Sequence, residues 1–295
     1  MRLTKEAERG AAMSFRARHT ALPEVHAISK KGNQVSEDRR LQKMAFPFIQ
    51  VAPRPSKPRK TGLTIVADRG MGMHRVEDLL ESSGEYIDYV KVAIGAFRLQ
   101  TEVFLKRKIN ALQKAGIRVF FAGDACEAAF MQGVSKDLYK KVKQLGAEAV
   151  EVSNAQISIS VQDKCELIKM AAAQGLQVVA EAGQKGHEDW TNSQAYVFAQ
   201  VDAYFKAGAW KVLVQGEGVS EGVAEFKGDL ILNLVARFDA QNFIFQAKDG
   251  ASQLWYINTL GNQANLDIDD HQVIDVELMR RGIRKRGLFG LVGSL

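Results

Sequence analysis

The segment Gln113-Lys-Ala-Gly-Ile-Arg-Val-Phe-Phe121 contains the end of a helix, a glycine break and the start of a buried strand. Gly116 is placed to end the helix, because glycine readily adopts the left-handed backbone that follows a helix C-terminus. The same order of signals recurs at residues 173–178 and 206–212. Repeated alternation of this kind predicts parallel strands that are connected by covering helices.

Outward from this segment, eight short apolar runs predict eight strands. They are rich in Val, Ile and Phe and almost continuous in apolar character, as expected of parallel strands covered by helices. The predicted strands are residues 63–67, 86–92, 117–122, 148–152, 176–181, 211–215, 242–247 and 264–268. Eight such units predict a single α/β domain of the closed (β/α)8 TIM-barrel type. A doubly wound open sheet is the alternative, but the chain contains neither a dinucleotide-binding fingerprint nor a Walker loop.

Two of the stretches between the strands show clear helical periodicity, and each is followed by a glycine. The expected buried faces are Val103, Leu105, Ile109 and Leu112 in residues 101–115, and Val161, Cys165, Ile168 and Ala172 in residues 161–174.

Composition and charge exclude several classes of protein. The 295 residues are 46% hydrophobic, with a net charge of +6 that is concentrated at the two ends. No aromatic residues are interleaved with these basic residues in the manner of a nucleic-acid-binding module, so we expect solvated basic ends and no nucleic-acid partner. Two cysteines suggest a reduced, cytoplasmic protein, and no apolar run is long enough to span a membrane.

The N-terminal part differs in composition from the rest. Residues 1–45 contain ten Lys/Arg and five Asp/Glu and lack steady periodicity. We therefore predict a basic extension over residues 1–52, either disordered or the product of a wrongly assigned start with Met44 as the alternative, and a barrel domain over residues 53–295. Residues 53–62, rich in proline and basic residues, are expected to form a stiff lead-in to the barrel.

Polar residues follow several of the predicted strands, and the carboxyl ends of barrel strands meet at one rim, where barrel active sites lie. The strongest signal is Glu151 and Glu181, at equivalent ends of neighbouring strands, a spacing suited to sharing Mg²⁺. Lys185 follows Glu181 and could neutralise a phosphate or deliver a proton. Gln215 and Asp267 could complete a polar rim, although each alone is weak evidence.

Three further strand-end residues have two interpretations each. Asp68 could hold a divalent cation or cap a glycine turn. Lys91, inside an apolar run, could stabilise an anion or form a structural ion pair with Asp88 or a neighbouring carboxylate. Glu127 could reach the mouth of the barrel or lie in the first turn of a helix.

Together, these motifs resemble the phosphosulfolactate synthase family. The resemblance covers the chain from about residue 57 to residue 287. The segments that carry it include Asp68-Arg69-Gly70, Tyr86-Ile87-Asp88-Tyr89-Val90-Lys91, Glu151-Val152-Ser153, Glu181-Ala182-Gly183-Gln184-Lys185, Asn265-Leu266 and Arg281-Gly282-Ile283-Arg284. The resemblance implies a (β/α)8 lyase that adds sulfite to phosphoenolpyruvate with Mg²⁺ and forms a C–S bond, a reaction of coenzyme M biosynthesis.

The same resemblance implies roles for individual residues. Asp68, Glu151 and Glu181 would hold Mg²⁺, with Glu181 also counted as catalytic. Lys91 would stabilise the developing enolate, and Lys185 would donate the proton. The implied substrate-binding residues are Arg69, Gly70, Gly95, Gly123, Ser153, Gln215 and Arg281.

The chain departs from the family pattern mainly at residues expected to contact anions. The turn Gly95-Ala96-Phe97 has no hydroxyl, Ala122-Gly123-Asp124 introduces a negative charge, and Gln215-Gly216-Glu217 lacks an arginine. The alternative hypothesis is therefore a non-catalytic barrel of the same family, related to stress or binding a partner, as for the stress-associated plant relatives. Homo-oligomerisation is left open.

Overall fold

The computed structural model describes residues 45–49, 51–182, 194–217, 219–221 and 226–283. The chain divides into two units, residues 1–45 and 46–295, and nearly all of the described residues belong to the second. The predicted extension over residues 1–52 therefore lies mainly outside the described part, and its boundary with the barrel stays a prediction.

Eight parallel strands close into a barrel in chain order, with β8 paired to β1. The strands are β1 Thr64–Asp68, β2 Tyr89–Val92, β3 Arg118–Phe121, β4 Ala149–Val152, β5 Gln177–Ala182, β6 Lys211–Val214, β7 Phe243–Gln246 and β8 Leu266–Asp269. The closed (β/α)8 barrel predicted from the sequence is confirmed, and the open sheet is excluded.

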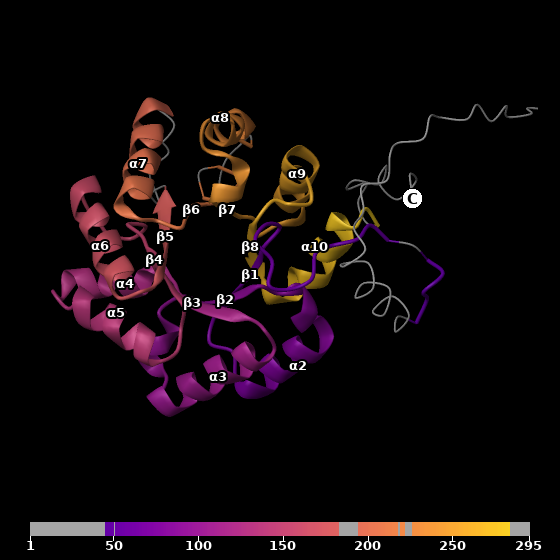
Figure 1. Cartoon of the computed structure of the whole chain (residues 1–295), viewed down its shortest axis with the longest axis horizontal. Helices are drawn as coiled ribbons and strands as arrows, with labels where there is room; N and C mark the ends of the chain where they lie inside the picture. Colours follow the sequence, from indigo (N-terminus) through magenta and orange to yellow (C-terminus); the bar gives the residue numbers. More distant parts are fainter. Residues whose placement is uncertain (1–44, 50, 183–193, 218, 222–225, 284–295) are drawn as a thin grey trace, which may run out of the picture. The chain divides into compact units, whose positions relative to one another are not determined.

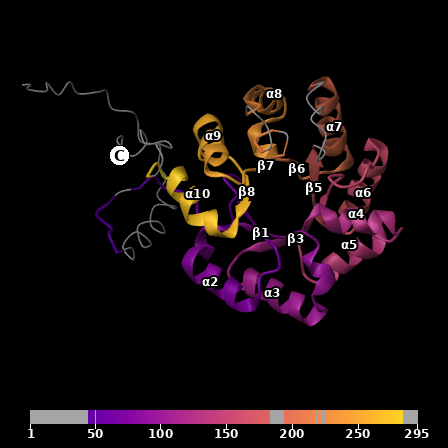
Figure 2. The same ribbon diagram turned by 180° about the vertical axis from the view of Figure 1, so that it is seen from behind.

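Helices surround the strands, as Figure 1 shows; Figure 2 gives the same ring from behind. The helices are α2 Met73–Ser83, α3 Glu102–Lys114, α4 Gly123–Met131, α5 Ser135–Gln144, α6 Val161–Ala173, α7 Gln194–Ala207, α8 Gly228–Phe238, α9 Gly250–Leu260 and α10 Val273–Arg280. Short 3-10 turns are η1 Gly84–Tyr86, η2 Ala96–Leu99, η4 Ala240–Asn242 and η5 Asp270–Gln272. Among the described residues, no helix has the length and apolar character needed to cross a bilayer.

The inside of the barrel is apolar at one level and polar at the next. The apolar level is filled by Leu63, Ile65, Tyr89, Phe120, Ala149, Val179, Leu213 and Ile244. Side chains alternate between the two faces of a strand, so a residue two positions later points to the same side. Lys91, Glu151, Glu181 and Gln215 each lie two positions after one of these residues, towards the carboxyl end of the barrel.

The buried faces of two helices differ from the predicted faces. Val103 of α3 is 79% exposed, and Lys108 is buried beside Leu105, Ile109 and Leu112 instead. In α6 the fully covered residues include Lys164, and Val161, Cys165 and Ala172 are only partly covered. In both helices the cause is a lysine that reaches a polar group at a strand end, which hydrophobic periodicity alone does not reveal.

Candidate active site

Lys91 occupies the centre of the polar level in the barrel. Its ammonium group donates a hydrogen bond to Asp267 on β8 and lies 3.5 Å from Glu151 Oε2 on β4. One strand separates Lys91 from each of these partners. Ala67 on β1 and Ala122 at the end of β3 have small side chains, which leave room for Lys91 to reach Asp267 and Glu151. Burial opposes its charge, but Asp267 and Glu151 outweigh that effect and raise the pKa of Lys91. The two carboxylates therefore favour the charged form of Lys91 inside the barrel.

The pairing with Asp88, one of the two interpretations of Lys91, does not occur. Asp88 accepts hydrogen bonds from the Thr64 amide at 2.9 Å and from Arg59 at 3.2 Å, near the start of β1. Lys91 is thus both a lumen residue and a member of an ion-pair network. Its partners are carboxylates of β4 and β8.

Glu151 and Glu181 are buried in the lumen with acceptor capacity that the described residues do not use. The two residues are only 4% and 5% exposed, and the Oε2 atom of each has no hydrogen-bond partner among the described residues. Burial, followed by the charge of Glu151, raises the pKa of Glu181. Gln215 is fully buried, and no described residue forms a hydrogen bond with its amide nitrogen or its amide oxygen. Buried polar atoms of this kind normally have partners, so these atoms are suited to a ligand.

The structure adds residues that the sequence left as minor rim candidates. Asp267 is fully buried and is shared by Lys91 and Lys248, whose Nζ lies 2.7 Å from Asp267 Oδ1. Burial acts to raise its pKa, but Lys248 and Lys91 together lower it. Asp124, beyond the end of β3, has a buried oxygen without a partner, and burial with the charge of Glu151 raises its pKa to about 6. Asp267 lies inside β8 and Asp124 follows β3, and a carboxylate within or shortly after an apolar strand was the signal that could have found them.

Asp68 does not join the two glutamates. It follows Val66 on the outer face of β1, and its Oδ2 accepts a hydrogen bond of 2.6 Å from Lys108 of α3. Its Oδ1 accepts from the amides of Gly70 and Met71 at 2.8 Å and 2.6 Å. Both oxygens are therefore engaged, which agrees with the capping interpretation.

Asp68 therefore lies apart from Glu151 and Glu181, the two other acids that the resemblance assigns to Mg²⁺. Within the described ranges, no three acidic, histidine or cysteine side chains are grouped to hold a metal. Glu151 Oε2, Glu181 Oε2 and the Gln215 amide oxygen are buried and free of hydrogen bonds. Mg²⁺ is commonly held by one or two carboxylates together with water and substrate oxygens. Glu151 and Glu181 fit that requirement, and Asp68 does not.

Gly123 and Ser153 form hydrogen bonds with glutamates close to the lumen. The Gly123 amide donates to Glu151 Oε1 at 3.2 Å, and a Cβ at this position would lie only 2.1 Å from Ser153 Oγ. Ser153 donates to Glu127, which also accepts the amide of Gln156 at 2.8 Å. Glu127, which lies on α4, therefore holds the loop after β4 in place and does not reach the mouth of the barrel.

Arg69, Gly70 and Gly95 lie at the carboxyl end of the barrel. Arg69 is exposed and pairs with Asp269 Oδ1 at 3.4 Å. A pocket of about 360 Å³ is lined by Arg69, Gly70 and Asp269, among others. Gly95 has a positive φ of 67° and precedes the 3-10 turn η2. These three predicted substrate-binding residues are therefore near the rim.

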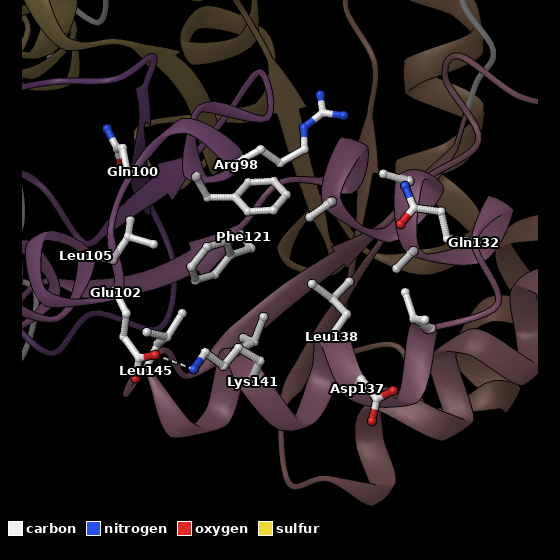
Figure 3. A pocket seen from close by; sticks show the side chains of 16 residues that line it. Arg98, Gln100, Glu102, Leu105, Phe121, Gln132, Asp137, Leu138, Lys141 and Leu145 are labelled. Atoms are coloured by element: carbon white, nitrogen blue, oxygen red, sulfur yellow. Dashed lines mark hydrogen bonds and ion pairs between the residues drawn. The ribbon is translucent and has the colours of Figure 1, made fainter.

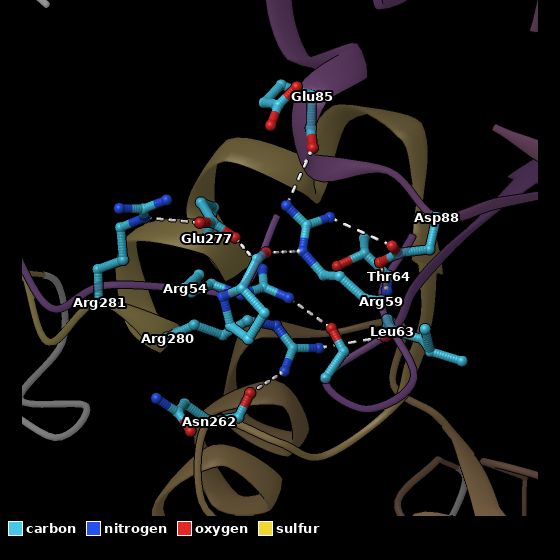
Figure 4. A network of polar contacts seen from close by, with 12 residues as sticks. Arg54, Arg59, Leu63, Thr64, Glu85, Asp88, Asn262, Glu277, Arg280 and Arg281 are labelled. Carbon is cyan, nitrogen blue, oxygen red and sulfur yellow. Dashed lines mark hydrogen bonds and ion pairs between the residues drawn. The ribbon is translucent and has the colours of Figure 1, made fainter. Parts of the chain in front are cut away.

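Of the two remaining predicted residues, one is not described and the other lies away from the rim. Lys185 lies outside the described residues. Arg281 lies at the opposite end of the barrel, where it donates to Glu277 at 2.6 Å (Figure 4). The adjacent Arg280 donates to the carbonyls of Leu63 and Ala264, which precede β1 and β8. The structure thus separates Arg281 from the lumen residues, because α10 runs back to the amino ends of the strands.

Comparison with known proteins agrees with this architecture. The family model described as (2R)-phospho-3-sulfolactate synthase (ComA) matches residues 52–286. A phosphosulfolactate synthase of Methanocaldococcus jannaschii is 32% identical over 233 residues, or 76% of this chain and 92% of the relative. One of Methanothermobacter thermautotrophicus is 30% identical over 248 residues, or 81% and 96%. Protein HEAT-STRESS-ASSOCIATED 32 of Arabidopsis thaliana is 22% identical over 261 residues, or 79% and 90%. The chain belongs to the (2R)-phospho-3-sulfolactate synthase family.

Proposed function

We propose that the protein adds sulfite to phosphoenolpyruvate, or to a close analogue, at the polar level of the barrel. The observation that carries this proposal is the set of buried, unsatisfied oxygens of Glu151 and Glu181 next to the Lys91 cation, in a chain of this family. In the reaction, the sulfur of hydrogensulfite bonds to C3 of the substrate. The electrons of the double bond move towards C2 and its carboxylate, C2 takes up the proton, and the phosphate ester stays intact.

The lumen residues have complementary tasks in this reaction. Lys91 keeps its proton and stabilises the negative charge that develops on the substrate carboxylate, an effect that is strong in a buried site. Glu151 and Glu181 would hold Mg²⁺, which acts as a Lewis acid towards the substrate oxygens when it is bound. Gln215 can orient a substrate oxygen with its buried, unbonded amide nitrogen. Lys185 remains the proposed proton donor.

The first test is a Glu181→Gln variant. Purified protein is mixed with phosphoenolpyruvate, sulfite and Mg²⁺, and the C–S adduct is followed by mass spectrometry. We expect kcat/KM to fall by about 100-fold or more, because the variant loses a carboxylate that faces the substrate. Glu166→Gln is the matched control, since Glu166 is an exposed residue paired with Lys169. Equal activity in the two variants, or no adduct from folded wild-type protein at saturating Mg²⁺, would contradict the proposal.

A non-catalytic barrel is the second candidate, and two observations favour it. Lys91 is already paired with two carboxylates, and the buried Oδ2 of Asp124 lies next to the lumen without a hydrogen-bond partner among the described residues. The resemblance to a plant protein named for heat stress points in the same direction. Phosphoenolpyruvate with Mg²⁺ must raise the melting temperature of an enzyme that binds it in the native state. No rise at millimolar ligand, together with no adduct, would favour the second candidate.

A further inference from the structure

A second cavity lies outside the barrel, between α3 on one side and α4 and α5 on the other (Figure 3). Its volume is about 440 Å³, roughly three times that of the ~150 Å³ cavity that admits benzene in a protein core. Phe97 and Phe121 form part of its wall and pack edge to face, with ring centroids 5.8 Å apart. The α4 side presents small residues, among them Ala125 and Ala128, which leave the space unfilled.

The cavity has few polar groups, and some of them are paired with one another whereas others are not. At one edge Glu102 and Lys141 neutralise each other, with 2.5 Å between Lys141 Nζ and Glu102 Oε2. At another edge Arg98 is exposed, and no carboxylate in the described ranges lies within ion-pair distance of it, although its charge acts on the carboxyl of Asp124. Gln100 Oε1 is buried and accepts no hydrogen bond from the part of the chain that the structure describes. An unpaired cation and an unsatisfied buried acceptor at one apolar cavity call for a ligand with an anionic group and a hydrogen-bond donor.

We propose that this cavity binds a small amphipathic anion. The apolar body of the ligand, of naphthyl size or a medium-length alkyl chain, lies against Phe97 and Phe121. Its carboxylate or sulfonate pairs with Arg98, and an N–H or O–H group donates to Gln100 Oε1. Small-molecule sites typically have this composition, with mainly apolar walls and a few polar groups that fix orientation. The site is separate from the barrel lumen and does not depend on the proposed reaction.

The probe for this site is 1-anilinonaphthalene-8-sulfonate, which carries an aromatic body, a sulfonate and an N–H donor. We expect saturable, one-to-one binding to the native protein, measured by fluorescence and by calorimetry. Ala128→Phe fills the cavity and should remove this binding without lowering the melting temperature. Ala115→Phe, at an exposed alanine at the end of α3, is the matched control and should leave the affinity unchanged.

Two further variants test the polar contacts. Arg98→Gln should weaken the sulfonate probe at least tenfold but leave the affinity for neutral N-phenyl-1-naphthylamine, which has the same body without the anion. Gln100→Leu should weaken both probes, because both donate an N–H. These two results would distinguish specific binding at this site from non-specific binding to an exposed apolar surface.

Three outcomes would overturn the proposal. The first is the absence of saturable binding. The second is binding that survives Ala128→Phe and is displaced by phosphoenolpyruvate with Mg²⁺. That result would place the probe in the barrel lumen. The third is self-association that Leu99→Glu disrupts, since Leu99 is 93% exposed beside the cavity and a second copy would then be its occupant. Failure of the sulfite reaction alone leaves the expected results for this cavity unchanged.

Discussion

Lys91 shows how strongly a single buried charge constrains this molecule. Replacing it with Met would leave Asp267 with Lys248 as its remaining cation and Glu151 without a paired cation in the described structure. Breaking a buried ion pair from one side costs about 3–5 kcal/mol, so we expect Lys91→Met to lower the free energy of unfolding by that amount. Urea denaturation at pH 7 measures it. Lys169→Met, at an exposed pair, should change stability by no more than about 0.5 kcal/mol.

The same variant carries a pH prediction. Asp267 is buried, yet Lys248 and Lys91 lower its pKa in the native protein, so its charge contributes stability above its unfolded pKa of about 3.9. That contribution disappears as the pH falls through the lower native value. Lys91→Met removes one of the two cations that lower the pKa of Asp267. The difference in free energy of unfolding between wild type and variant should therefore decrease as the pH is lowered from 7 to 3. A constant difference across this range would contradict the ion-pair account.

At the level of elements, α3 is attached to the barrel through a buried ion pair as well as through apolar packing. Lys108 and Asp68 are both fully buried, and 2.6 Å separates Nζ from Oδ2. We expect Lys108→Met to destabilise the protein by about 3–5 kcal/mol, and the double variant Asp68→Asn with Lys108→Met to recover part of the loss. A double-mutant cycle in urea measures the coupling.

The double variant also tests the role of Asp68. In the proposed function, Mg²⁺ lies at Glu151 and Glu181, and the role of Asp68 is the ion pair with Lys108. The double variant should then bind Mg²⁺ with the same affinity as the wild-type protein, measured by calorimetry. Loss of Mg²⁺ binding in this folded variant would restore Asp68 as a metal ligand.

At the scale of the whole molecule, the two ends of the barrel have different tasks. In the described part of the chain, the carboxyl end holds buried oxygens of Glu151 and Glu181 without hydrogen-bond partners, whereas a network of arginines closes the amino end, where Arg280 Nε also lacks a partner (Figure 4). Arg54 pairs with Glu277, and the fully buried Arg280 donates to the carbonyls of Leu63, Asn262 and Ala264. One side chain thereby joins the segments that precede β1 and β8, where the barrel closes.

This arrangement predicts that stability and activity can be separated. Arg280→Met removes the side-chain donor from the buried Ala264 carbonyl and from the Asn262 carbonyl, whereas the Leu63 carbonyl keeps the Leu266 amide as a donor. An unsatisfied buried carbonyl costs about 1–3 kcal/mol, so the melting temperature should fall. Activity per folded molecule should not change, because the lumen residues lie at the other end. Arg281→Met is the control, since Arg281 is partly exposed, and it should have a smaller effect on melting. A large loss of activity in folded Arg280→Met would contradict the separation.

The sequence by itself determined the number, order and type of the strands, because covered parallel strands must be nearly continuous in apolar character and a glycine follows most of the helices, with Asp239 after α8 as an exception. It also determined which residues follow the strands, and hence Glu151, Glu181 and Gln215 as lumen candidates. Only the tertiary structure decided which way each side chain points and what it meets. Asp68 and Glu151 read alike along the chain, yet one faces α3 and is neutralised by Lys108, whereas the other faces the lumen beside Lys91. Ion pairs between residues far apart in sequence, and the end of the barrel that Arg281 reaches, depend on closure of the barrel, and local periodicity contains no information about that closure.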